Sequence, residues 1–152
     1  MLKDFFRWHS LKAKIDQGRH QVLFRPREIW WCSIGANVGV EENGKHALFE
    51  RPVLIFRRFN DEMFWGLPLT SKIKTDKPFY FTFSLHQRSQ TALLSQMRVL
   101  SSKRLVRRLG KVSDSQFATL NKAVVNFITE TDPLRGPRVP NGNSEYHDTR
   151  GR

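Results

Sequence analysis

The sequence has little sulfur and no long apolar run, and each shortage excludes a class of protein. Its 152 residues include one cysteine, Cys32, which excludes a disulfide framework and a thiolate zinc site and makes a reducing cytoplasm the expected compartment. No apolar segment approaches the roughly 20 residues of a membrane-spanning helix. Charged side chains also interrupt residues 1–9, so we expect no signal peptide there.

Acidic residues are scarce as well, with 14 Asp and Glu against 26 Lys and Arg, for a net charge of +12. Such an excess indicates a polyanionic partner, either nucleic acid, an anionic membrane or an acidic protein. No acidic residue occurs between Asp76 and Asp114. The basic residues in that interval are Lys77, Arg88, Arg98, Lys103, Arg104, Arg107, Arg108 and Lys111. They form either a phosphate-facing surface or a solvated basic face without a ligand.

Hydrophobic residues make up 39% of the chain, including twelve Phe and four Trp, which is enough for the core of one domain. We divide the chain into an N-terminal helical extension (1–27), a folded domain (28–129) and a flexible polar tail rich in proline and glycine (130–152). The helix is expected over residues 2–16, where apolar side chains recur at helical spacing. It either docks on the domain or lies on a membrane surface.

Strand patterns dominate the folded domain. Apolar or alternating segments predict strands at 29–34, 52–56, 63–69, 79–83 and within 91–100, with a long polar loop over 35–50. A short basic helical turn is expected over 102–109. Ser113 and Gln116 have the spacing of a capping box and predict the start of a final helix. The fold class is therefore mainly β, a small curled barrel with an N-terminal helical extension and a C-terminal α-helix before the tail.

Few kinds of catalytic chemistry remain open to this sequence. The five histidines are scattered, and there is no phosphate-binding glycine loop, dinucleotide fingerprint or nucleophile elbow, so we expect no metal site and no cofactor. Cys32 lies in an apolar strand and is predicted to be a buried structural thiol. Polar residues at strand ends remain, and they need no function on composition alone: Arg51, Thr70, Ser71, Gln96 and Arg98.

These same segments resemble the MazF/PemK family of toxin endoribonucleases. The similar pieces, in order, are Glu28–Trp31, Arg51–Leu54, Pro68–Ser71, Leu93–Leu100 with Lys103–Leu105, and Gly110–Ser113, which together span roughly residues 28–129. The resemblance implies an SH3-like barrel, usually a homodimer. It also implies cleavage of single-stranded RNA without a metal or other cofactor, inhibition by an antitoxin that we expect to be acidic, and no association with a membrane.

The resemblance also implies a site. Arg51 and Thr70 take the places of the family's catalytic arginine and threonine, and Glu41 aligns loosely with a loop glutamate that would serve as general base. A guanidinium and a hydroxyl can stabilise the charge that builds when a ribose 2′-hydroxyl attacks the adjacent phosphate. The simpler roles are a surface salt bridge between Arg51 and Glu50, and a turn position for Thr70. The residues expected to contact RNA are Ser71, Lys72, Gln96, Arg98, Arg104 and Arg107.

Some positions depart from the family pattern. Ser95 and Ser101 stand where many members have acidic residues, and Leu93 stands where some have arginine, so the identity of the general base is open. An RNA endonuclease toxin is the leading hypothesis. The alternatives are a non-catalytic nucleic-acid-binding barrel and a gyrase-poisoning toxin of the CcdB type, against which the Arg51 and Thr70 segments argue.

Overall fold

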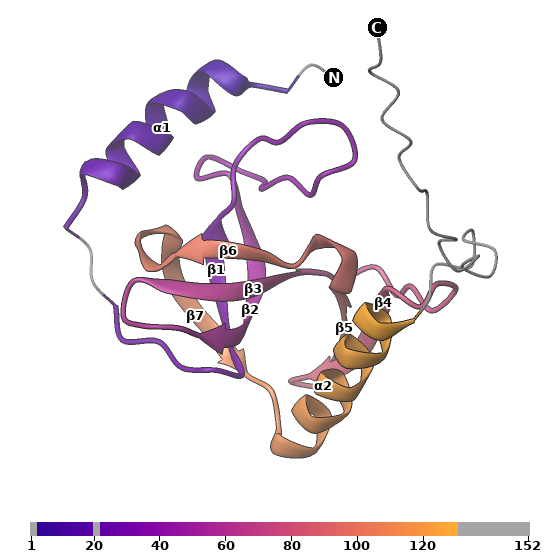
Figure 1. Ribbon diagram of the computed structural model, residues 1–152. Helices are drawn as coiled ribbons and strands as arrows, with labels where there is room; N and C mark the ends of the chain where they lie inside the picture. Colours follow the sequence, from indigo (N-terminus) through magenta and orange to yellow (C-terminus); the bar gives the residue numbers. More distant parts are fainter. Residues whose placement is uncertain (1–2, 20–21, 131–152) are drawn as a thin grey trace, which may run out of the picture.

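The computed structural model describes residues 3–19 and 22–130, and most of this part of the chain is β-structure (Figure 1). The tail predicted over 130–152 lies outside the described residues, except for Glu130. The elements, in chain order, are α1 (Phe5–Gln17), β1 (Glu28–Ser33), β2 (Glu50–Arg58), β3 (Met63–Thr70), β4 (Tyr80–Leu85), β5 (Arg88–Leu93), the 3₁₀ turn η1 (Leu94–Gln96), β6 (Arg98–Ser101), the 3₁₀ turn η2 (Ser102–Arg104), β7 (Leu105–Lys111) and α2 (Asp114–Thr129).

The seven strands form one antiparallel sheet. The pairing runs β4-β5-β3-β2-β1-β7, and β6 pairs with β3 beside this path. The mainly β fold with a helix near each end of the described chain is thus confirmed. Among the described residues no pairing joins β4 to β7, so the sheet remains open between its first and last strands.

Both faces of the central strand β2 are buried, which explains its continuous apolar run. Val53 and Ile55 belong to one core cluster, and Leu54, which lies between them, belongs to the other. Successive side chains of a strand point to opposite faces, so the two cores lie on opposite sides of the sheet. Helix α2 covers the Leu54 side through Leu120 and Val124.

The helix α2 begins where the sequence predicts. The Ser113 side chain accepts a hydrogen bond from the Gln116 backbone N–H, which satisfies one of the unpaired donors at the helix start. The expected helical turn over 102–109 is wrong in its second half. Only residues 102–104 form a 3₁₀ turn, and residues from Leu105 onward pair with β1, because strand pairing satisfies the backbone groups of this segment.

Helix α1 lies beside the loop that joins β1 to β2, at the same end of the sheet (Figure 1). Its Trp8 is buried and packs against Phe49 of that loop, with ring centroids 5.6 Å apart. Gly35 lies under this tryptophan with φ +95°, and a Cβ there would meet the Trp8 ring at 2.3 Å. The loop therefore requires glycine at this point, and α1 docks on the domain.

Candidate functional site

Arg51 stands at the start of β2, where the long loop between β1 and β2 ends. Its side chain is 12% exposed and has three partners. Nε donates to the Asn43 carbonyl at 2.8 Å, Nη1 donates to the Leu69 carbonyl at 3.2 Å, and Nη2 lies 2.8 Å from Oε2 of Glu42. A guanidinium has five N–H groups, so donors remain for a ligand while the group is held in one orientation.

Glu50 binds a different arginine from the one expected. Its buried carboxylate accepts two hydrogen bonds from Arg107, each 2.9 Å long, and the Arg107 guanidinium lies 4.7 Å from the ring centroid of Trp31. The salt bridge between Arg51 and Glu50 that the sequence suggested is therefore replaced by two separate pairs. Adjacent residues of a strand point to opposite faces, which sends Glu50 and Arg51 to different partners.

Thr70 ends β3 and is half-buried, while Ser71 and Lys72 after it are exposed. The Thr70 hydroxyl oxygen accepts a hydrogen bond from the Lys72 backbone N–H at 3.2 Å. Because the oxygen acts as the acceptor in this contact, the hydroxyl hydrogen is free to be donated elsewhere. This geometry combines the turn role expected for Thr70 with an available donor.

A pocket of about 580 Å³ brings Arg51, Thr70 and Ser71 together. Lys72 does not line it. Its wall also contains Lys45, His46 and His86, which the sequence analysis did not select, together with Arg88 of the acid-free basic interval and the carboxylate of Glu50. Three cationic lining residues, Lys45, Arg51 and Arg88, outnumber the one carboxylate, so the pocket suits an anionic ligand.

The two histidines adopt unusual backbone conformations. His46 has φ 60°, and the β4–β5 turn consists of His86 and Gln87, with φ 48° and 61°. Two-residue turns of this kind normally contain Asn or Gly, so the local sequence offers no signal that would have placed His86 at the pocket. Strained conformations of non-glycine residues are enriched at functional sites.

The other residues expected to contact RNA do not line this pocket. Gln96 holds the long loop, because its side-chain oxygen accepts from the Glu42 backbone N–H at 3.2 Å and its Nε2 donates to the Val40 carbonyl at 3.4 Å. Arg98 is half-buried in β6. Arg104 donates to the Ser33 carbonyl at 2.9 Å and stacks on Trp8 of α1 at 5.6 Å.

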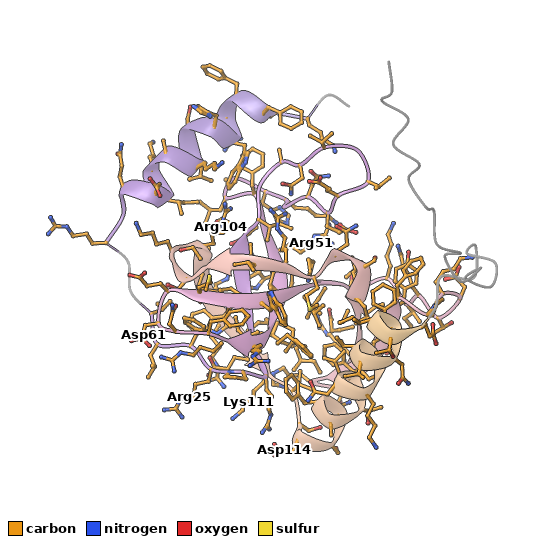
Figure 2. All side chains as sticks on the ribbon, in the orientation of Figure 1. Arg25, Arg51, Asp61, Arg104, Lys111 and Asp114 are labelled. Atoms are coloured by element: carbon orange, nitrogen blue, oxygen red, sulfur yellow. The ribbon has the colours of Figure 1, made fainter. Side chains whose placement is uncertain are left out.

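The loop glutamates differ in their placement. Glu41, the residue that the resemblance pointed to, is exposed, whereas its neighbour Glu42 is the carboxylate in contact with Arg51. Figure 2 shows Arg51 near the end of the sheet that lies beneath this loop and α1, with Arg25, Lys111 and Asp114 at the opposite end. Glu42 is thus the loop carboxylate that contacts Arg51, whereas the acidic residue that lines the pocket itself is Glu50.

Cys32 lies in the core, next to β2 and β7. Burial raises its pKa to about 12, against a smaller opposite influence of Arg104 and Arg98, so the thiol keeps its proton at neutral pH. The prediction of a buried structural thiol is confirmed. Among residues 3–19 and 22–130, no cluster of three or more metal-ligating side chains occurs, and neither helix is long and apolar enough to cross a membrane.

Comparisons with known proteins identify a family and a shared fold. A family model of the PemK-like, MazF-like toxins of type II toxin-antitoxin systems matches residues 25–128. No curated protein matches the chain. Among solved structures, a MazF from Deinococcus radiodurans is similar at a TM-score of 0.58 and 19% identity, covering 72% of this chain and 99% of that chain.

Two mycobacterial structures are similar at the same level. An endoribonuclease in complex with its cognate antitoxin has a TM-score of 0.56 and 15% identity, covering 73% of this chain and 100% of its own. A MazF toxin from Mycobacterium tuberculosis has a TM-score of 0.51 and 18% identity, covering 69% of this chain and 100% of its own. At these identities the likeness concerns the fold.

Proposed function

Since this chain belongs to the PemK-like, MazF-like family of type II toxins, we propose that it is an endoribonuclease that cleaves single-stranded RNA in the cytoplasm. The observation that carries the proposal is the pocket in which a fixed guanidinium, Arg51, and a free hydroxyl donor, Thr70, lie together. Groups of this kind stabilise developing negative charge on phosphoryl oxygens without reorganisation.

The proposed reaction is a transesterification within the substrate. The ribose 2′-oxygen attacks the adjacent phosphorus while its proton passes to a base, and the bond from phosphorus to the 5′-oxygen breaks. Arg51 neutralises charge on the nonbridging oxygens, and the Thr70 hydroxyl, aided by pocket water, supports protonation of the leaving oxygen. The products are a 2′,3′-cyclic phosphate and a 5′-hydroxyl. Because the substrate supplies the nucleophile, the reaction requires no metal ion.

Glu42 serves two roles in this proposal. In the free protein its carboxylate lies 2.8 Å from Nη2 of Arg51, so a phosphate that binds the remaining donors of the guanidinium would compete with Glu42 for this one. When the phosphate displaces it, Glu42 becomes a carboxylate beside the reacting atoms and is the better placed of the two loop glutamates to accept the 2′-hydroxyl proton. Geometry comes before pKa in choosing a general base. We therefore favour Glu42 over Glu41, with Glu41→Gln as the matched control for Glu42→Gln.

Further contacts to RNA follow from the pocket wall. Ser71, Lys45 and Arg88 line it, and Arg107 lies at its edge beside the lining residues Glu50 and Trp31. We propose that these residues hold the phosphates and bases on either side of the cleaved bond. Lys72, Gln96 and Arg98 remain proposed contacts for longer RNA.

The proposed partners follow from charge and from the relatives. A chain with net charge +12 that attracts phosphates also attracts carboxylates, and one similar mycobacterial endoribonuclease is described in complex with its cognate antitoxin. We propose that an acidic antitoxin inhibits this chain by occupying the same cationic pocket. We also propose that the toxin acts as a homodimer.

The test is cleavage of a labelled single-stranded RNA in excess EDTA, with the product ends identified by mass spectrometry. The expected ends are a 2′,3′-cyclic phosphate and a 5′-hydroxyl, and an RNA with 2′-deoxyribose at the cleaved position should resist. Thr70→Ala should lose activity by about 10²–10³, whereas Thr70→Ser should retain much of it. EDTA-sensitive cleavage or a 3′-hydroxyl product would contradict the mechanism. RNA binding without any cleavage would favour the non-catalytic alternative.

A further inference from the structure

A second cleft, of about 280 Å³, lies between α1 and the β6–η2 segment. Helix α1 is outside residues 25–128, the part of the chain that matches the family model. The cleft is therefore a feature that this chain adds to the shared fold. The residues that give it chemical character are His9, Lys12 and Asp16 from α1, with Lys103 and Arg104 from η2.

The walls of the cleft are held together by specific contacts. Lys103 Nζ donates to the Asp16 carbonyl at 2.6 Å, and Arg104 connects the Ser33 carbonyl to the Trp8 ring. Trp8 itself is only 8% exposed. These contacts fix α1 against the domain, so the cleft exists before any ligand binds.

The cleft carries an excess of positive charge, because Lys12, Lys103 and Arg104 outnumber the single carboxylate of Asp16. Among the described residues, none of Lys12, Lys103 and Arg104 forms an ion pair with a carboxylate. Burial lowers the pKa of Arg104, and the nearby charge of Arg98 lowers it further, while Cys32 opposes both. Arginine nevertheless stays protonated in proteins, so its partly buried charge forms no ion pair within the described chain.

The cleft lies near the pocket that contains Arg51. Cys32 of β1 pairs with Arg51 of β2 on one side and with Leu105 of β7, which follows Arg104, on the other. Neighbouring strands lie about 4.8 Å apart, so the two flanking strands are separated by roughly 10 Å at this end of the sheet. Figure 2 shows Arg51 and Arg104 at that same end, beneath the long loop and α1.

We propose that the cleft between α1 and η2 is a second phosphate-binding subsite, which holds a backbone phosphate of the RNA strand whose cleaved phosphate lies at Arg51. This inference rests on the proposed function. RNA is favoured as the ligand because it repeats a phosphate at every nucleotide, so that a strand with one phosphate at Arg51 can present another to a cationic cleft nearby. Arginine and lysine are the side chains that proteins use for such contacts.

The test measures binding of an uncleavable RNA, with 2′-deoxyribose at the cleaved position, as a function of salt. Each lost phosphate contact reduces the slope of log K against log salt by about 0.7, which corresponds to roughly five-fold weaker binding at 0.1 M salt. We expect this change for Lys12→Gln, an exposed residue with no hydrogen bond from its side chain among those described, and for Lys103→Gln. Lys122→Gln, exposed on α2, is the matched control and should leave the slope unchanged.

RNA length separates the two sites. A dinucleotide that carries only the cleaved phosphate should bind the wild type and Lys12→Gln equally, because it cannot reach the cleft. Independently of cleavage, inorganic phosphate should shift the NMR signals of the His9 imidazole in the wild type, and less in Lys12→Gln.

The possible failures are distinguishable. If the wild type binds and cleaves RNA while Lys12→Gln and Lys103→Gln keep the full salt slope, the subsite is wrong and the proposed function stands. If an acidic peptide shifts the His9 signals and the RNA does not, the cleft binds protein instead. If the wild type neither binds nor cleaves RNA, the proposed function has failed and the subsite falls with it.

Discussion

Replacing Arg51 with alanine should lower both the stability and the activity of the protein, and the two losses can be measured separately. Arg51→Ala deletes two hydrogen bonds to carbonyls and one ion pair with Glu42. Hydrogen bonds to charged groups contribute about 1.5–3 kcal/mol each when buried. The Glu42 side chain is 26% exposed and can turn toward water, which reduces the loss. We therefore expect the free energy of unfolding to fall by about 3–6 kcal/mol, mostly from the two lost hydrogen bonds.

Activity should fall by a much larger factor. Loss of one preorganised donor to the developing charge typically costs about 10²–10³ in rate. Arg51→Lys keeps the positive charge, but an ammonium cannot reproduce the planar fork of donors, so we expect it to be poor in cleavage and intermediate in stability.

A double variant separates the two effects. Arg51→Ala leaves the Glu42 carboxylate without its cation, whereas Arg51→Ala combined with Glu42→Gln removes that charge as well. The double variant should regain about 1 kcal/mol of stability and none of the activity. Thermal unfolding followed by circular dichroism measures the first quantity, with roughly 2–4 °C expected per kcal/mol, and initial rates on a labelled RNA measure the second.

Two results would refute this reasoning. A rate for Arg51→Ala within three-fold of the wild type would mean that the guanidinium does not act on the reacting phosphate. Recovery of the rate in the double variant would mean that Arg51 only holds the loop, and that the lost activity came from a displaced Glu42.

Two further predictions concern the scaffold of the site. The buried Cys32 thiol, with a pKa of about 12 against an ordinary value of 9.0, keeps its proton in the folded state while the unfolded chain releases it. The free energy of unfolding should therefore fall as pH rises above about 9, and urea titrations of Cys32→Ala should lack this fall; the same slope in both proteins would contradict the burial argument. Trp8→Ala should lower the free energy of unfolding by about 3–5 kcal/mol, because it removes packing against Phe49 and Gly35, and Trp8→Phe should lower it less. Hydrogen exchange over residues 35–50 should accelerate in Trp8→Ala, and unchanged protection there would mean that α1 does not hold the loop.

Short-range features of this protein could be predicted from its sequence. The alternation of residues 79–83 and the apolar run of 52–56 identified β4 and β2, because a strand repeats every two residues whatever it pairs with. The Ser113 cap located the start of α2 for a similar reason, since a cap acts within one turn. The order of short segments also indicated the toxin family, and with it Arg51 and Thr70 as the residues to test.

Partner choice was decided only by the tertiary structure. Whether Arg51 pairs with Glu50 or with Glu42 depends on which face of β2 each side chain occupies and on how the loop folds back over it. Arg104 and Arg107 belong to the same basic stretch, yet one stacks on Trp8 and the other binds Glu50. His86 reaches the pocket through a turn without a recognisable signal. Local patterns specify the period and ends of each element. Contacts between residues 9 to 96 positions apart, from Arg51–Glu42 to Arg104–Trp8, depend on strand register and loop closure, which no short segment encodes.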